Sequence, residues 1–230
     1  MKLGIVGDGR MARAIAAEAG AAGDEVVAML GLDDNRGACG ITRERLGHAD
    51  VVCEFTTPAS VVANLRALHR LGARVVCGTT GWDAERAAME AEWRSGPGAL
   101  LASSNFSLGV HLFFAAARAL AAGAAGLPAF DGFLHERHHA AKLDAPSGTA
   151  LALQRMVRDA DSTRAWPVTS VRAGMIPGEH EVVLDAPFES IVLRHVARDR
   201  RVFASGALTA AHWLQGRQGV FTLDDMLTGD

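Results

Sequence analysis

Two neighbouring histidines and a lysine precede a predicted helix start in residues 136–150, which read ERHHAAKLDAPSGTA. Imidazoles transfer protons near neutral pH and an ammonium attracts anions, so His138, His139 and Lys142 combine both kinds of chemistry. Ser147 is a natural N-cap for the apolar run that follows, which leaves backbone amides pointing out of a helix N-terminus. Such amides stabilise a carboxylate or phosphate. The segment predicts a site for a small acidic substrate. The alternative is a surface histidine pair before an ordinary capped helix.

A glycine-rich turn near the start of the chain predicts a nucleotide site. Residues 2–6 are expected to form a buried strand, and the sequence GDGRMA then leads into a helical run at residues 14–19. In this context Gly7 permits the tight turn, Gly9 lets a pyrophosphate approach the backbone, and Ala12 allows close packing of helix on strand. A plain glycine turn in an α/β protein is the alternative.

The first half of the chain alternates strands and helices. Further strands are expected at residues 25–30, 49–55, 73–77 and 99–102, with helices at 60–71 and 83–93. This alternation predicts an α/β fold with a Rossmann-like doubly wound parallel sheet, whose ligand binds at the carboxyl ends of the strands. Small polar residues follow three of these strands, at residues 56–57, 78–80 and 103–105, where they could reach a cofactor or could simply form turns.

The second half predicts a different architecture. A helix at 108–122 is followed by expected strands at 131–135, 168–172, 180–185 and 190–196, with helices at 149–159 and 206–215. This order indicates a second, α+β domain built on a mostly antiparallel sheet. We expect residues 1–107 to form a dinucleotide-binding domain, to which 207–230 return, and residues 108–206 to form a substrate-binding and oligomerisation domain.

The second strand lacks an acid where a dinucleotide-binding strand usually ends in one, because Gly31 and Leu32 occupy that place. Asp33 could accept the ribose hydroxyls from a shifted register, whereas Arg36 could meet a 2′-phosphate. The sequence therefore leaves the choice of NADH or NADPH open and predicts tolerance of both, with less than about a hundredfold preference.

Composition excludes several function classes. With 23 basic and 26 acidic residues the net charge is −3, which favours neither nucleic acid nor an anionic membrane as partner. The three cysteines lack metal-ligand spacing, so we expect no metal and a reducing, cytoplasmic setting. The opening apolar run is too short for a signal peptide, and no apolar run is long enough to cross a membrane.

These motifs together resemble the 4-hydroxy-tetrahydrodipicolinate reductase family, also called dihydrodipicolinate reductase. The resemblance runs nearly end to end and is carried by the glycine turn, by GTTGW at 78–82, by SNFSLGV at 104–110 and above all by HHAAKLDAPSGT at 138–149. It implies reduction of a cyclic imine dicarboxylate by NADH or NADPH, on the route to diaminopimelate and lysine, by a homotetramer.

The resemblance also implies roles for individual residues. His138 would be the acid/base residue and Lys142 a second proton donor and substrate anchor. Further substrate ligands would be His139, Ser147, Gly148 and Thr149. The cofactor would be held by Gly7, Asp8, Gly9, Arg10, Met11, Gly78, Thr79, Thr80, Ser103, Ser104, Asn105 and Phe106. The candidate ribose acid, Asp33, comes from the reading of the second strand and not from the resemblance.

The chain also departs from the family pattern. It is short after the second strand, Ala12 replaces the commoner third glycine, and Arg137 stands where an apolar residue is more usual. Two other functions stay open: a two-domain dehydrogenase of another small amino or imino acid, and a regulator that binds NAD(P) without catalysis. The constellation of His138, Lys142 and Ser147 favours an enzyme, because a regulator has no need of it.

Overall fold

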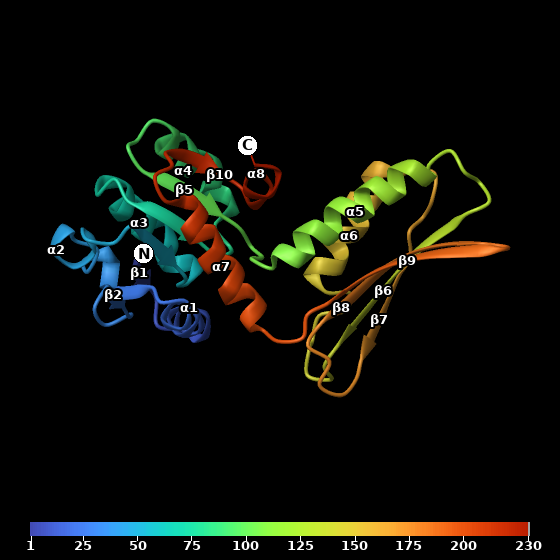
Figure 1. Ribbon diagram of the computed structural model, residues 1–230, viewed down its shortest axis with the longest axis horizontal. Coiled ribbons are helices and arrows are strands. Elements are labelled where there is room, and N and C mark those ends of the chain that lie inside the picture. Colours follow the sequence, from blue (N-terminus) through green and yellow to red (C-terminus); the bar gives the residue numbers. More distant parts are fainter. Residues whose placement is uncertain (230) are drawn as a thin grey trace. The chain divides into compact units, whose positions relative to one another are not determined.

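The computed structural model describes residues 1–229, which divide into two units that are described separately (Figure 1). Unit 1 comprises residues 1–107 together with the chain from residue 201 onward, and unit 2 comprises residues 108–200. The second boundary lies where helix α7 begins, so the boundary expected at residue 206 falls inside that helix. No helix within the described part of the chain has both the length and the apolar character needed to cross a membrane.

Unit 1 contains a parallel sheet with strand order β10-β5-β4-β3-β1-β2. Its strands are β1 (Lys2–Val6), β2 (Glu25–Leu30), β3 (Val51–Glu54), β4 (Arg74–Cys77), β5 (Ala99–Ala102) and β10 (Gly219–Phe221). The central strands are almost continuously apolar, because helices cover a parallel sheet on both faces. Leu3, Ile5 and Leu100 are accordingly inaccessible to solvent.

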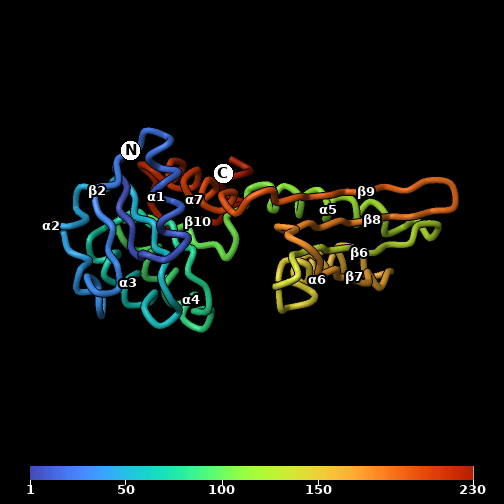
Figure 2. The backbone as a smooth tube through the Cα atoms, turned by 90° about the horizontal axis from the view of Figure 1, so that it is seen from below, coloured from blue at the N-terminus to red at the C-terminus, as the bar shows by residue number. Residues whose placement is uncertain are grey.

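Helices lie on both sides of this sheet. They are α1 (Arg10–Ala21), α2 (Arg43–Leu46), α3 (Pro58–Arg70), α4 (Asp83–Arg94), α7 (Arg201–Leu214) and α8 (Leu223–Thr228), with a 3₁₀ turn, η1, at Arg36–Ala38. Figure 2 shows α1 and α7 on one side and α3 and α4 on the other. Pro58 at the first position of α3 explains its sharp start, since proline fits where no amide partner is needed. The predicted doubly wound sheet is confirmed.

The order in which the chain adds strands to this parallel sheet reverses at β1. From β1 it passes to β2 on one side, and β3 then continues on the other side. In open α/β sheets the crevice at such a reversal, at the carboxyl ends of the strands, is where ligands bind. The glycine turn follows β1 at this point.

Unit 2 consists of a four-stranded sheet and two helices. The sheet has the order β7-β6-β8-β9, formed by β6 (Asp131–His138), β7 (Val168–Arg172), β8 (Glu179–Ala186) and β9 (Glu189–Val196). Only the β6–β7 pair is parallel among the described pairs of this sheet, so the prediction of a mostly antiparallel sheet is confirmed. Helices α5 (Leu108–Ala124) and α6 (Gly148–Ala160) pack on one face, around the buried Trp166, Leu134 and Val182.

Three features differ from the elements expected from sequence. Strand β6 continues to His138 instead of ending at residue 135, because its last residues pair with β7 and β8. Helix α7 begins at Arg201, five residues before the expected start, and Gly206 is a buried residue within it. Strand β10, helices α2 and α8 and the η1 turn were not expected, since short elements carry little periodicity.

Candidate active site

A buried carboxylate and an imidazole form the centre of the site in unit 2. Glu136 and His138 are two residues apart on β6, so both side chains point to the same, helix-covered face of the sheet. His138 Nδ1 lies 2.6 Å from Glu136 Oε2, and the Glu136 side chain is completely buried. This pairing favours the imidazole tautomer that presents its other nitrogen, Nε2, to a ligand.

The second oxygen of Glu136 is held by two donors. Arg172, opposite His138 on β7, donates to Oε1 over 2.7 Å, and the backbone amide of Ser147 donates to the same oxygen over 3.2 Å. Arg172 also donates to the backbone carbonyl of Asp144. The carboxylate thus ties β6 to β7 and to the start of α6.

The start of α6 has the expected N-cap. The Ser147 hydroxyl accepts a hydrogen bond from the amide of Ala150 over 3.2 Å, whereas Gly148 is exposed and Thr149 partly exposed in the first turn. Ser147 is itself buried, and its hydroxyl lies 3.3 Å from His180 Nε2. The first turn of α6 therefore adjoins the Glu136–His138 pair.

Burial and neighbouring charges shift the acidities of these groups. Burial alone would raise the pKa of Glu136, but hydrogen bonds from its neighbours, Arg172 among them, outweigh it and hold the pKa at about 2. Burial lowers the pKa of His138, and Lys142 and Arg172 act in the same direction against the attraction of Glu136. Burial lowers the pKa of His180 to about 4, with His138 adding to the effect. Both imidazoles are therefore mostly neutral at pH 7.

Lys142 and His139 lie in the loop between β6 and α6. The ammonium of Lys142 is 2.7 Å from a carboxylate oxygen of Asp144, and the Lys142 amide donates to the carbonyl of His139. Lys142 is close enough to His138 to influence its pKa. The structure thus brings Lys142, His138 and Ser147 to one end of β6, and His139 is partly exposed beside them.

Glu136, His138 and His180 lie close enough together for their side chains to bind one metal ion. One donor atom from each lies within 4.8 Å of the others, and this group of three is found among the described residues. The Glu136 oxygens, however, are already engaged with His138, Arg172 and Ser147, and two cationic side chains stand nearby. Positive neighbours oppose a divalent cation, so the arrangement suits proton transfer and anion binding better.

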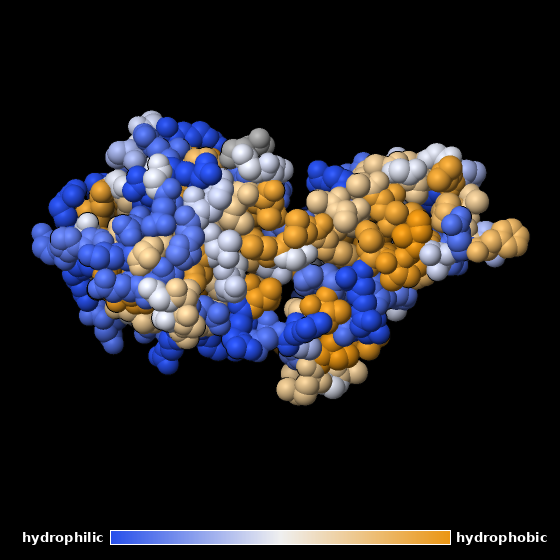
Figure 3. All heavy atoms as spheres, viewed as in Figure 1, coloured by the Kyte–Doolittle hydropathy of each residue, from blue (hydrophilic) through white to orange (hydrophobic). Residues whose placement is uncertain are grey.

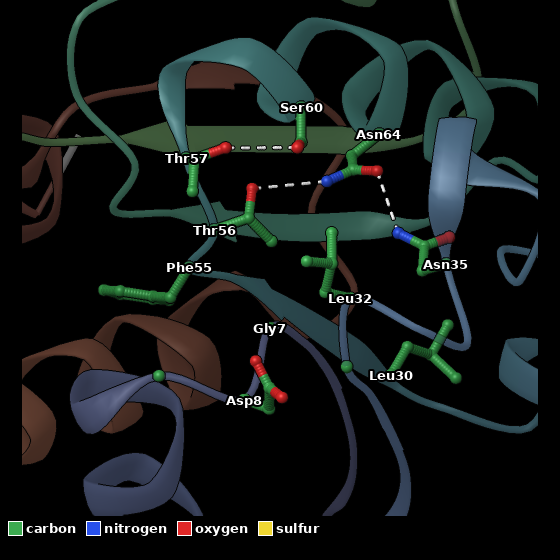
Figure 4. Close-up of a pocket in the computed structure, with 12 residues that line it drawn as sticks. Gly7, Asp8, Leu30, Leu32, Asn35, Phe55, Thr56, Thr57, Ser60 and Asn64 are labelled. Carbon is green, nitrogen blue, oxygen red and sulfur yellow. Dashed lines mark hydrogen bonds between the residues drawn. The ribbon is translucent and has the colours of Figure 1, made fainter.

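Unit 1 has a pocket at the carboxyl ends of β1, β2 and β3 (Figure 4). The glycine turn forms one wall, the end of β2 a second, and the β3–α3 connection a third. The lining residues are Gly7, Asp8, Gly9, Leu30, Gly31, Leu32, Asn35, Phe55, Thr56, Thr57, Ser60 and Asn64. Within this described set Asp8 is the one charged side chain. Neutral amides and hydroxyls supply the other polar groups, as a nucleotide site requires.

The glycine turn leaves the pocket open to a dinucleotide. Gly7 has φ +120°, and a Cβ there would lie 2.1 Å from the Phe55 carbonyl oxygen, so a side chain is excluded. A Cβ on Gly9 would meet nothing within 4 Å, which leaves room for a ligand beside the backbone at the start of α1. These residues fit a pyrophosphate-containing cofactor, which would be held by the α1 N-terminus.

A second buried carboxylate, Glu54 at the end of β3, organises the wall behind the pocket. It accepts hydrogen bonds from the hydroxyls of Thr56 and Thr79, the latter over 2.6 Å, and from the Asn64 amide over 3.0 Å. Thr79 in turn accepts from the Thr56 amide over 2.7 Å, and Asn35 donates to Asn64 over 2.9 Å. Figure 4 shows the side chains of Thr56, Asn64 and Asn35 linked in sequence.

The remaining cofactor residues expected from sequence lie outside the lining of this pocket. Arg10 and Met11 begin α1. Gly78 packs against the Phe55 ring, Phe106 has its ring 5.7 Å from that ring, and Thr80 is exposed at the end of β4. The Ser103 hydroxyl donates to the Asn105 carbonyl over 2.8 Å, and Ser104 is exposed beside them. The strand ends thus share one edge of the sheet.

Asp33 and Arg36 also lie outside the pocket. Asp33 Oδ1 is 2.8 Å from Arg36 Nη2, and the side chains are 91% and 74% exposed. In this arrangement the two charges pair with each other on the surface.

Sequence reasoning assigned no role to Glu136, Arg172 or His180. The spacing of Glu136 and His138 was a usable signal, because residues two apart on a strand share a face. Arg172 and His180 reach the pair only through strand pairing, with His180 directly opposite Glu136 and Arg172 opposite His138. In unit 1 the roles of Asn35, Asn64 and Glu54 were likewise not anticipated.

A parallel sheet with a dinucleotide turn, joined to a unit bearing an acid–base pair, defines the class of two-domain nicotinamide-dependent oxidoreductases. The family model described as dihydrodipicolinate reductase, N-terminus, matches residues 1–106, and the corresponding C-terminus model matches residues 109–227. The chain belongs to the dihydrodipicolinate reductase family, which confirms the resemblance.

Named relatives agree with this membership. The 4-hydroxy-tetrahydrodipicolinate reductase of Gluconobacter oxydans is 42% identical over 198 residues, covering 78% of each chain. The enzyme of that name from Acidiphilium cryptum is 35% identical over 250 residues, covering 99% of this chain and 97% of the relative. Among solved structures, a dipicolinate-bound dihydrodipicolinate reductase from Paenisporosarcina sp. TG-14 has a TM-score of 0.79 at 21% identity, covers 96% of this chain and 97% of its own, and shares the fold.

Proposed function

We propose that this protein reduces 4-hydroxy-tetrahydrodipicolinate to tetrahydrodipicolinate with NADH or NADPH, in the route to diaminopimelate and lysine. The observation that carries the proposal is the Glu136–His138 pair beside Lys142 and the start of α6. An acid–base group next to anion-binding groups suits a dicarboxylate that gains a proton during reduction. Family membership and the names of the relatives support the same substrate.

The substrate carboxylates would bind to cationic and amide groups of unit 2. Lys142 would exchange its contact with Asp144 for a substrate carboxylate, and the amides of Gly148 and Thr149 would donate at the N-terminus of α6. His139 and the Ser147 hydroxyl would complete this set. The positive end of the helix also favours the electron-rich form of the substrate.

His138 would protonate the reduced ring. Loss of water, made up of the 4-hydroxyl and a proton from ring carbon 5, gives a conjugated imine. Hydride addition at ring carbon 4 then leaves an enamine whose carbon 5 must take up a proton. A nicotinamide cofactor supplies the hydride when bound. Glu136 would orient the His138 ring and stabilise its imidazolium form, while Lys142 would serve as the second proton donor.

The cofactor would bind in unit 1. The amides from Gly7 to Met11 would hold its pyrophosphate, and the residues that follow β4 and β5 would contact its nicotinamide half: Gly78, Thr79, Thr80, Ser103, Ser104, Asn105 and Phe106.

We further propose a cytoplasmic homotetramer. An exposed apolar surface on unit 2, which includes Phe188, Val192 and Val196, supports self-association.

An assay of nucleotide oxidation tests the proposed function. The unstable substrate is generated in place by the aldol synthase reaction that condenses pyruvate with aspartate semialdehyde, and consumption of NADH or NADPH is followed. We expect turnover by the wild-type protein and a loss of about a hundredfold or more in His138→Gln, with cofactor affinity retained. Turnover only with another amino or imino acid would indicate the alternative dehydrogenase. Cofactor binding without turnover of any cyclic imine would indicate a regulator.

A further inference from the structure

The carboxylate of Asp8 occupies the place where the second strand of a dinucleotide fold ends. A Cβ added to Gly31, directly after β2, would lie 2.9 Å from Asp8 Oδ2 and 3.2 Å from Asp8 Cγ. The Asp8 carboxylate therefore lies directly beside the backbone of Gly31. An acid in this region normally comes from the end of the strand itself, but here it comes from the glycine turn.

The backbone that carries Asp8 is fixed at both sides. The Gly7 amide donates to the Leu30 carbonyl over 2.8 Å, which ties the turn to the end of β2. The Arg13 side chain donates to the Asp8 carbonyl over 2.9 Å, which ties the turn to α1. The carboxylate is thus placed by its own backbone, on the turn side of the pocket in Figure 4.

The electrostatics of the pocket follow from this placement. Asp8 is the charged member of the described lining, while Asp33 and Arg36 pair with each other on the surface, outside it. A carboxylate accepts hydrogen bonds from the two hydroxyls of an adenosine ribose and repels a phosphate on the 2′ oxygen.

We propose that Asp8 is the residue that selects NADH over NADPH, and that Asp33 has no part in the selection. This inference rests on the proposed function only in requiring that unit 1 bind a nicotinamide dinucleotide. The sequence alone predicted tolerance of both NADH and NADPH, on the basis of the end of the second strand and the side chains after it. A selecting carboxylate on Asp8 makes the preference for NADH stronger than that.

Direct binding measurements separate the two acids. Dissociation constants for NADH and NADPH are measured by calorimetry without substrate, and the ratio of the two is compared among variants. We expect NADH to bind about tenfold or more tightly in the wild type, and Asp8→Asn to reduce the ratio about tenfold, mainly by tighter NADPH binding. Asp33→Asn and the neighbouring control Asp34→Asn should leave the ratio within about twofold, because both acids pair with surface arginines.

A second variant displaces the carboxylate without removing its charge. Gly31→Ala places a methyl carbon 2.9 Å from the present position of Asp8 Oδ2, which is too close, and the flexible Asp8 side chain can move aside without loss of the fold. We expect this variant to lower the NADH preference as well. Two results would overturn this inference but not the proposed function. One is a wild-type preference for NADPH, and the other is a ratio of dissociation constants that is unchanged in Asp8→Asn but strongly reduced in Asp33→Asn. Absence of binding for both nucleotides would overturn it together with the proposed function.

Discussion

At the scale of single residues, the pairing of Glu136 with His138 explains how a buried imidazole can take part in proton transfer. Burial disfavours the imidazolium, while the carboxylate 2.6 Å away favours it. Arg172 and the Ser147 amide hold the other carboxylate oxygen, so the Glu136 group stays ionised and in place. The acid strength of His138 thus depends on residues that need not touch the substrate.

This dependence predicts a shift in the pH profile. The pKa of His138 lies below its ordinary value, and we propose its imidazolium as the proton donor, so kcat/KM should fall as the pH rises through that pKa. Glu136→Gln removes an interaction that raises the pKa of His138, while its amide oxygen can still accept from Arg172. The falling limb should therefore move to lower pH. A limb that stays in place or moves to higher pH would contradict the role of Glu136.

The second residue-scale prediction concerns the anion site. Lys142→Ala should weaken binding of a planar pyridine dicarboxylate by about tenfold or more, since a charge-assisted contact to the carboxylate is lost. Calorimetry of the inhibitor measures this directly. Lys2→Ala is the matched control, because Lys2 is the other lysine of the chain and lies in unit 1. Equal inhibitor affinity in all three proteins would place the anion site elsewhere.

At this scale the sequence indicated which residues lie together in the candidate site better than it indicated the contacts between them. His138, Lys142 and Ser147 were identified from residue types and spacing within one segment. The partners of Glu136 come from β7 and the α6 start, and only the pairing of β6 with β7 brings Arg172 to the carboxylate. Such contacts depend on strand register, which a single sequence does not contain.

At the scale of elements, the ends of β3 and β4 are joined through Glu54. Its carboxylate is inaccessible to solvent and accepts from Thr56, Thr79 and Asn64. The wall of the pocket in unit 1 therefore depends on one buried carboxyl group at a strand end.

Removing that carboxyl group should destabilise unit 1. We expect Glu54→Ala to lower the free energy of unfolding by about 2–4 kcal/mol, because several buried donors lose their acceptor. Glu54→Gln should cost less, since it keeps the shape and one acceptor oxygen. Denaturant unfolding measures both values. A loss in Glu54→Ala no larger than in Glu54→Gln would show that the acceptor role is unimportant.

The sequence predicted elements with a clear local signal well, and elements that depend on pairing with a distant strand poorly. Strand β2 and helix α4 lie within one residue of the expected bounds, because apolar periodicity and the charged first turn of α4 are local signals. Strand β10 has three residues and depends on pairing with β5, about 120 residues away in sequence, which no local pattern reveals. The extension of β6 to His138 has the same cause.

At the scale of the whole molecule, unit 2 exposes apolar surface that suits self-association. Figure 3 shows hydrophobic residues gathered over α5 and the adjoining end of the sheet. Strand β9 is an edge strand of the described sheet, and Phe188, which precedes it, is fully exposed. Edge strands with exposed apolar side chains are prone to pair with another chain.

We expect the protein to have four times the 24.2 kDa mass of one chain in solution. Val192→Asp, on β9, should shift it to smaller species, because a charge would be buried in the contact. Leu127→Asp is the control, as Leu127 is similarly exposed but lies outside the sheet. Light scattering at micromolar concentration measures the mass. A monomeric wild type would contradict the prediction.

The central claim is that hydride from a reduced nicotinamide reaches ring carbon 4 of 4-hydroxy-tetrahydrodipicolinate on this protein. Deuterium transfer tests it most directly. The substrate is generated in place and reduced with NADH that carries deuterium on the transferable face, and the product is analysed by mass spectrometry and NMR. We predict one deuterium per product molecule, located at carbon 4, with formation strongly slowed in His138→Gln. Product without deuterium at carbon 4, or label only in the cofactor, would contradict the account.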